Sequence, residues 1–125
     1  MIYTTYFAKL KKLPENIKPI AICAKPPKGY AGPIYRTLAP KYDFLAKYKI
    51  TGDVEEFTEN YIGQVLNRLN PVKAVTELYY QLGVAPNTCD IALVCFEKSS
   101  DFCHRYLVAD WLRKAGYDCE EWGEH

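Results

Sequence analysis

Hydrophobic and polar positions alternate along the chain in a way that predicts strands and helices over its whole length. Short apolar or β-branched runs predict four strands, over residues 1–7, 18–24, 91–97 and 117–122. Apolar positions at helical spacing predict helices over residues 41–49, 54–69, 71–82 and 102–115. Residues 26–40 contain four prolines and two glycines, which exclude a long helix or a central strand and predict an ordered loop.

Capping residues mark the ends of these predicted helices. Asp53 is followed three residues later by Glu56, a pair that resembles a capping box before an apolar helical stripe. Asn70 precedes Pro71, a combination typical of an N-cap and a first helical residue. Gly116 stands where a glycine commonly ends a helix.

The order of the elements predicts an α/β fold. Residues 91–122 read as strand, helix and strand, which is a βαβ unit with parallel strands. Together with the two N-terminal strands, this unit predicts a small Rossmann-like layered fold, with about four mostly parallel strands and helices on both faces. A chain of 125 residues with 49% hydrophobic residues forms one core, so residues 1–125 are expected to be a single domain.

Charge and cysteine content narrow the function classes. The net charge is +1, but residues 1–50 carry ten basic and two acidic residues, whereas residues 51–125 carry six and thirteen. No apolar stretch approaches the roughly 20 residues that cross a bilayer, and the first residues do not form a secretory leader, so we expect a cytoplasmic protein without a membrane partner. Five cysteines without regular spacing favour a reducing compartment. These features leave the oligomeric state open.

Reactive residue types gather where the strand 91–97 meets the helix 102–115. Cys95, Glu97, Cys103, His104 and Arg105 lie within 11 residues of one another at this junction. In open α/β sheets, ligands bind where strand carboxyl ends meet helix N-termini. Strand alternation places Cys95 beside Glu97, and the helical arrangement of apolar positions directs His104 inward. The first helical turn favours an anion or a thiolate, which makes Cys103 a candidate nucleophile.

Several specific chemistries can be compared with this spacing. A phosphatase loop of the Cys-x5-Arg type is excluded, because Asp101 lies six residues after Cys95. Zinc binding by Cys95, Cys103 and His104 would need an unfamiliar spacing and two adjacent ligands, so no metal is expected. Phosphate-binding and dinucleotide-binding glycine motifs are absent, and no cofactor is expected. A disulfide between Cys95 and Cys103 remains open as a redox switch.

We therefore predict a pocket for an anionic small molecule, with a nucleotide as the best fit. In this prediction Glu97 and His104 act as acid and base, and Cys103 acts as the nucleophile. The predicted ligand-binding residues are Arg105, Cys95, Tyr35, Arg36 and Lys28. Lys98 adds a nearby cation, and Tyr30 or Tyr35 is available to stack on a base.

Two other function classes stay open. In a non-enzymatic interaction protein, the same residues would form a buried polar network with a Glu97–Arg105 ion pair, or Arg105 would pair with Asp101. In a nucleic-acid-associated module, the lysines of the N-terminal half would contact phosphates and tyrosines would stack on bases.

The segments Cys95-Phe-Glu97 and Asp101-Phe-Cys103-His104-Arg105 resemble the family called domain of unknown function 488. The resemblance extends over nearly the whole chain, through Tyr3, Thr5 and Tyr6, the segment 26–28 and the segment 38–40. It implies a small α/β fold and a role in bacteria, archaea or their phages, without an assigned activity. Longer members carry an Asp-x-Arg pair on the first strand, where this chain reads TTYFAKL. A site that needs this pair would draw its cations from Lys25, Lys28 or Arg36.

Overall fold

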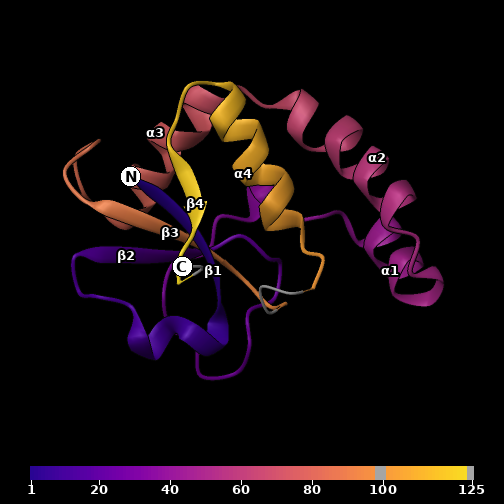
Figure 1. Ribbon diagram of the computed structural model, residues 1–125, viewed down its shortest axis with the longest axis horizontal. Helices are drawn as coiled ribbons and strands as arrows, with labels where there is room; N and C mark the ends of the chain where they lie inside the picture. The colour runs from indigo at the N-terminus through magenta and orange to yellow at the C-terminus, as the bar shows by residue number, and fades with distance from the viewer. Residues whose placement is uncertain (98–100, 124–125) are drawn as a thin grey trace.

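The computed structural model describes residues 1–97 and 101–123, and its centre is a four-stranded sheet. The strands are β1 Ile2–Tyr6, β2 Ile17–Ala21, β3 Asp90–Cys95 and β4 Cys119–Glu121. They lie in the order β2-β3-β1-β4, and every neighbouring pair is parallel (Figure 1). The predicted α/β class and the parallel βαβ unit are confirmed.

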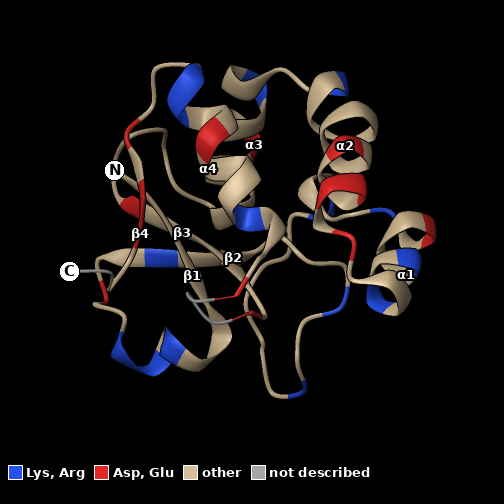
Figure 2. Ribbon diagram, turned by 45° about the vertical axis from the view of Figure 1, so that its right-hand side comes forward, with Lys and Arg blue, Asp and Glu red and all other residues tan. Residues whose placement is uncertain are grey.

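Helices pack on this sheet, as predicted, but they are divided unevenly between its faces. The α-helices are α1 Tyr42–Thr51, α2 Val54–Gln64, α3 Pro71–Leu82 and α4 His104–Lys114. The 3₁₀ helices are η1 Phe7–Lys12, η2 Arg36–Leu38 and η3 Leu66–Arg68. Figures 1 and 2 show the α-helices together on one side of the sheet, with η1 on the other. Among the described residues, no helix is long and apolar enough to cross a membrane.

The central strand β3 lies in the middle of the core and is buried on both faces. Its residues from Ile91 to Cys95 are buried, which confirms the prediction that both of its faces are covered. Leu93 lies between Thr4 of β1 and Ile20 of β2, and in parallel pairing these side chains share the face toward the α-helices. Burial of such apolar side chains stabilises the fold by about 1.5–3 kcal/mol for each large residue.

The predicted capping residues form the expected hydrogen bonds. The Asp53 carboxylate accepts from the backbone N–H of Glu56 at 3.0 Å and begins α2. The Asn70 side chain accepts from the backbone N–H of Val72 at 2.9 Å and begins α3. Gly83 ends α3 with a φ of 72°, a conformation that favours glycine.

Several predicted elements end earlier than their patterns indicated, and the strand predicted over 18–24 ends at Ala21. The helix predicted over 54–69 is α2 to Gln64, followed by η3, because the last turn tightens into i→i+3 hydrogen bonds from Arg68 to Val65 and from Leu69 to Leu66. The strand predicted over 91–97 ends at Cys95, since that residue pairs with Tyr6, the last residue of β1. Beyond this point β1 gives way to η1 and offers no strand to pair with.

Candidate functional site

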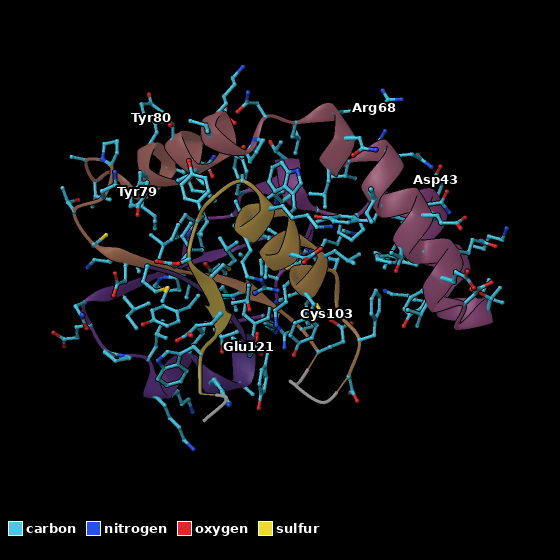
Figure 3. All side chains as sticks on the ribbon, turned by 45° about the horizontal axis from the view of Figure 1, so that its top comes forward. Asp43, Arg68, Tyr79, Tyr80, Cys103 and Glu121 are labelled. Atoms are coloured by element: carbon cyan, nitrogen blue, oxygen red, sulfur yellow. The ribbon has the colours of Figure 1, made fainter. Side chains whose placement is uncertain are left out.

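The candidate site lies at the carboxyl end of β3, where α4 begins. Cys95 is the last residue of β3, Cys103 is the N-cap of α4, and His104 is the first residue of α4. Figure 3 shows Cys103 at the start of α4. The exposed fractions are 3% for Cys95, 2% for Cys103 and 5% for His104, so the cluster is almost shielded from solvent.

Four of the predicted site residues come together here. His104 Nδ1 lies 3.4 Å from Cys95 Sγ and 3.8 Å from Cys103 Sγ. The two sulfur atoms and the ring nitrogen all lie within 4.8 Å of one another. Cys95 Sγ lies 3.8 Å from Glu97 Oε2. The predicted proximity of Cys95 to Glu97 and the inward direction of His104 are confirmed.

The surroundings of His104 fix which ring nitrogen faces the sulfur atoms. Nε2 lies 2.9 Å from the carbonyl oxygen of Ile22. A carbonyl oxygen only accepts hydrogen bonds, so Nε2 carries a proton and donates it. The ring of Tyr61 packs edge-on against His104 with centroids 5.4 Å apart. These contacts hold the ring with Nδ1 directed at both thiols.

The helix boundary explains how two consecutive residues reach one point. Cys103 has an extended backbone, with φ −150° and ψ 146°, whereas His104 is already helical. The two adjacent side chains nevertheless converge on Cys95, because a change of backbone conformation separates the two residues.

Hydrogen bonding distributes charge unequally over the two cysteines. The pKa of Cys103 is lowered, first by its hydrogen bond with Cys95 and then by His104 and the backbone N–H of Arg105, against the opposing effect of burial. The pKa of Cys95 is raised, by its hydrogen bond with Cys103 and by burial. Burial, followed by the nearby Cys103, raises the pKa of the Glu97 carboxyl. Cys103, at the N-cap of α4, is therefore the thiol of the pair that ionises first.

Arg105 is buried in a network of its own. Its Nε and Nη2 donate to the two carboxylate oxygens of Glu121 at 3.0 and 2.8 Å, and its Nη1 donates to the backbone carbonyl of Glu97 at 2.6 Å. Its ion-pair partner is thus Glu121 of β4, not Glu97 or Asp101 as the sequence suggested. Arg105 is completely buried and its guanidinium contacts protein acceptors, while its assignment to ligand binding stays a prediction.

The other predicted ligand-binding residues make contacts of their own, and Arg36 Nε donates to the backbone carbonyl of Ala24, next to Cys23, at 3.1 Å. Tyr35 is buried and donates its hydroxyl to Glu77 of α3. Tyr35 and Arg36 line a cavity of about 370 Å³ together with Glu77 and Tyr80, and neither cysteine of the cluster is among its lining residues. Lys28 is exposed in the loop after β2. Lys98 lies outside the described residues, so its predicted contribution stays untested.

The sequence reasoning missed Cys23 and Glu121. Cys23 is buried, and burial raises the pKa of its thiol to about 11, with the nearby charges of Cys103 and Glu97 acting in the same direction. Cys23 falls within the predicted strand 18–24, and placing that strand beside β3 would have brought its end to the site. Glu121 also falls within a predicted strand, but its partner depends on the strand order.

Comparison with known families identifies the family to which the chain belongs. The family DUF488-N3a, described as the active DUF488-N3 subclade, matches residues 3–116. Comparisons with curated proteins and with solved structures gave no match. The family match spans most of the 125 residues and includes the whole Cys95–Arg105 segment. The chain belongs to the DUF488 family, in its active N3a subclade.

Proposed function

We propose that this protein is an enzyme in which Cys103 acts as a nucleophile on a small anionic molecule of nucleotide-like character. The observation that carries the proposal is the gathering of Cys103 Sγ, Cys95 Sγ and His104 Nδ1 within 4.8 Å at the start of a helix. A reactive cysteine needs a group that stabilises its thiolate, and a neighbouring imidazole and a helix N-terminus both do so. Membership of a subclade described as active agrees with a catalytic role.

The residues around Cys103 fit defined roles in such a reaction. The Cys103 thiolate would attack an electrophilic carbon of the substrate, and the bond between that carbon and the leaving group would break. Glu97, whose carboxyl pKa is raised, would give its proton to the leaving group. Water would then hydrolyse the Cys103 adduct, with the Glu97 carboxylate taking the proton from the water. Before the attack, His104, whose Nε2 is held by the Ile22 carbonyl, would take the thiol proton of Cys103 on Nδ1, and the resulting imidazolium would stabilise the thiolate.

The substrate class rests on the location of the site and on nearby positive charge. Anions bind favourably at a helix N-terminus, where backbone N–H groups lack partners within the helix. The loop after β2 carries Lys25 and Lys28, both exposed, and it leaves the sheet on the strand next to β3. Figure 2 shows basic residues on this loop and on η1. These cations would bind the phosphate groups of a nucleotide-like substrate.

The network around Arg105 favours one alternative, a non-enzymatic interaction protein. The pair of Arg105 with Glu121, together with the hydrogen bond from Thr4 to Glu121 at 2.6 Å, ties the start of α4 to β1 and β4. Such a network would serve a structural protein equally well. It does not involve the contacts among the two thiols and His104, so the two functions make different predictions about cysteine reactivity.

Selective alkylation tests the nucleophile. The reduced protein is treated with iodoacetamide at neutral pH in the presence of a chelator, and each cysteine is followed by peptide mass mapping. Cys103 is expected to react before Cys89, which is more exposed and serves as the internal reference. Cys95→Ser should slow the reaction of Cys103, whereas Cys119→Ser should leave it unchanged. A Cys103 that reacts no faster than Cys89 would overturn the proposal.

A thermal-shift screen tests the substrate class. The reduced protein is heated with nucleosides, nucleotides, phosphosugars and short oligonucleotides, because a ligand that prefers the native state raises its stability. We expect a rise with nucleotides that persists in Cys103→Ser, since that variant removes the nucleophile and leaves the cations in place. A rise with oligonucleotides alone would favour the nucleic-acid alternative, and no rise with any of these compounds would favour the interaction protein.

A further inference from the structure

We propose that Cys95 Sγ, Cys103 Sγ and His104 Nδ1 form a binding site for Zn²⁺, and that the bound ion holds the site in an inactive state. The binding of the ion follows from the geometry of the three atoms alone. The inactivation rests on the proposed function, because a sulfur bound to zinc is no longer available as a nucleophile.

The distances among the three atoms are close to those of a zinc site. A tetrahedral ion with bonds of about 2.3 Å to sulfur and about 2.0–2.1 Å to nitrogen separates sulfur from nitrogen by about 3.6 Å, and two sulfurs by about 3.8 Å. His104 Nδ1 lies 3.4 and 3.8 Å from the two sulfur atoms, and all three atoms lie within 4.8 Å of one another. Small side-chain adjustments are therefore enough to bind the ion.

The imidazole is already oriented for binding a metal. Histidine ligands of metals usually donate their second N–H to a carbonyl or a carboxylate, which fixes the tautomer and the ring orientation. Nε2 of His104 makes this contact with the Ile22 carbonyl at 2.9 Å, so the lone pair of Nδ1 points at Cys95 and Cys103. The contact connects the end of β2 to α4 and does not depend on the ion.

The ligand types select among metals. Thiolate and imidazole ligands suit Zn²⁺, whereas Mg²⁺ and Ca²⁺ require oxygen ligands. Two thiolates and a neutral imidazole balance the charge of a divalent cation in a buried place. Three protein ligands leave a fourth position, and Glu97 Oε2 lies 3.8 Å from Cys95 Sγ. The backbone change between Cys103 and His104 allows two adjacent residues to bind one ion, at a spacing that is unfamiliar for zinc sites.

Metal titration tests the site directly. The metal-free, reduced protein is titrated with Zn²⁺ against a chromophoric chelator, and separately with Co²⁺ as a spectroscopic substitute. We expect one ion per chain, and a Co²⁺ spectrum with sulfur-to-metal charge transfer and tetrahedral bands. Cys95→Ser and Cys103→Ser should each weaken Zn²⁺ binding by more than about 100-fold, since even loss of a residue behind the ligands costs about 10–100-fold. Cys119→Ser is the control and should bind as the wild type does.

The outcomes separate this proposal from the proposed function. An octahedral Co²⁺ spectrum without charge transfer, or unchanged Zn²⁺ affinity in both cysteine variants, would overturn the metal site. The spectrum is measured on the wild type, so it decides even where a variant fails to fold. Zn²⁺ should also protect Cys103 from iodoacetamide, and alkylation at an unchanged rate in saturating Zn²⁺ would overturn the inactivation. Slow alkylation of the metal-free protein would instead count against the nucleophile and leave the metal site standing.

Discussion

Removing the carboxylate of Glu121 should destabilise the protein more than removing an exposed charged side chain. Glu121 accepts two hydrogen bonds from Arg105, whose side chain is completely buried, and one from Thr4. Glu121→Ala leaves this guanidinium without its counter-charge in the protein interior. Breaking a buried ion pair by removing one partner costs about 3–5 kcal/mol. A domain of this kind has about 5–15 kcal/mol of stability in all, so the variant should lie close to unfolding.

Equilibrium unfolding in urea, followed by circular dichroism, measures this cost. Asp110→Ala is the matched control, because Asp110 makes an exposed pair with Lys114 on α4, and exposed pairs of this type contribute about 0.3–0.5 kcal/mol. The double variant Arg105→Met with Glu121→Leu removes both charges and should recover most of the loss, as apolar replacement of buried pairs often does. A Glu121→Ala protein that loses less than about 1 kcal/mol would refute the reasoning, since that is the range of solvent-exposed pairs. If this cost is confirmed, the stability of the Arg105→Ala variant has to be measured before a loss of ligand binding in it is attributed to the site.

Three further predictions concern stability. Burial raises the pKa of the Cys119 thiol from 9.0 to about 11. The stability that this buried thiol contributes is therefore present below pH 9 and is lost as the pH rises through 11, by at most about 3 kcal/mol. Urea unfolding at several alkaline pH values should show this decline in the wild type and a flatter profile in Cys119→Ala. Asn70→Ala removes the acceptor for the Val72 N–H and should cost about 1 kcal/mol in thermal unfolding, and an unchanged melting temperature would contradict this. Tyr61→Phe removes the donor to the buried Leu38 carbonyl and should cost about 1–3 kcal/mol, whereas a cost near zero would mean that water replaces the hydroxyl.

Local patterns were sufficient to predict most of the fold. The caps at Asp53 and Asn70 act within three residues of their own position, so the sequence alone determines them. The parallel arrangement of β3 and β4 follows from the helix between them, because a crossover of this length returns the chain in the same direction. The same reasoning placed Cys95, Glu97, Cys103 and His104 at one edge of the sheet, where they are found.

The partner of Arg105 could not be predicted in the same way. Strand β1 lies between β3 and β4, so α4 passes over β1 and its first turn faces the ends of both β3 and β4. Glu121 on β4 therefore lies beside Arg105, although the order of the elements along the sequence does not indicate this pairing. Within the β3–α4 loop Glu97 contributes only its backbone carbonyl to Arg105. Strand order depends on interactions along the whole chain, which a local pattern of charges does not record.

The chemistry of the site depends on where α4 begins. The apolar pattern predicted a helix from residue 102, and the helix starts at His104. Were Cys103 helical as well, consecutive side chains would diverge by about 100° around the axis, and the two ligand atoms would be directed apart. Because Cys103 is extended and His104 is helical, the thiol and the imidazole converge with Cys95 instead. Two residues of difference in a helix boundary, too small to alter the fold, thus decide whether this edge of the sheet holds separate side chains or one reactive cluster.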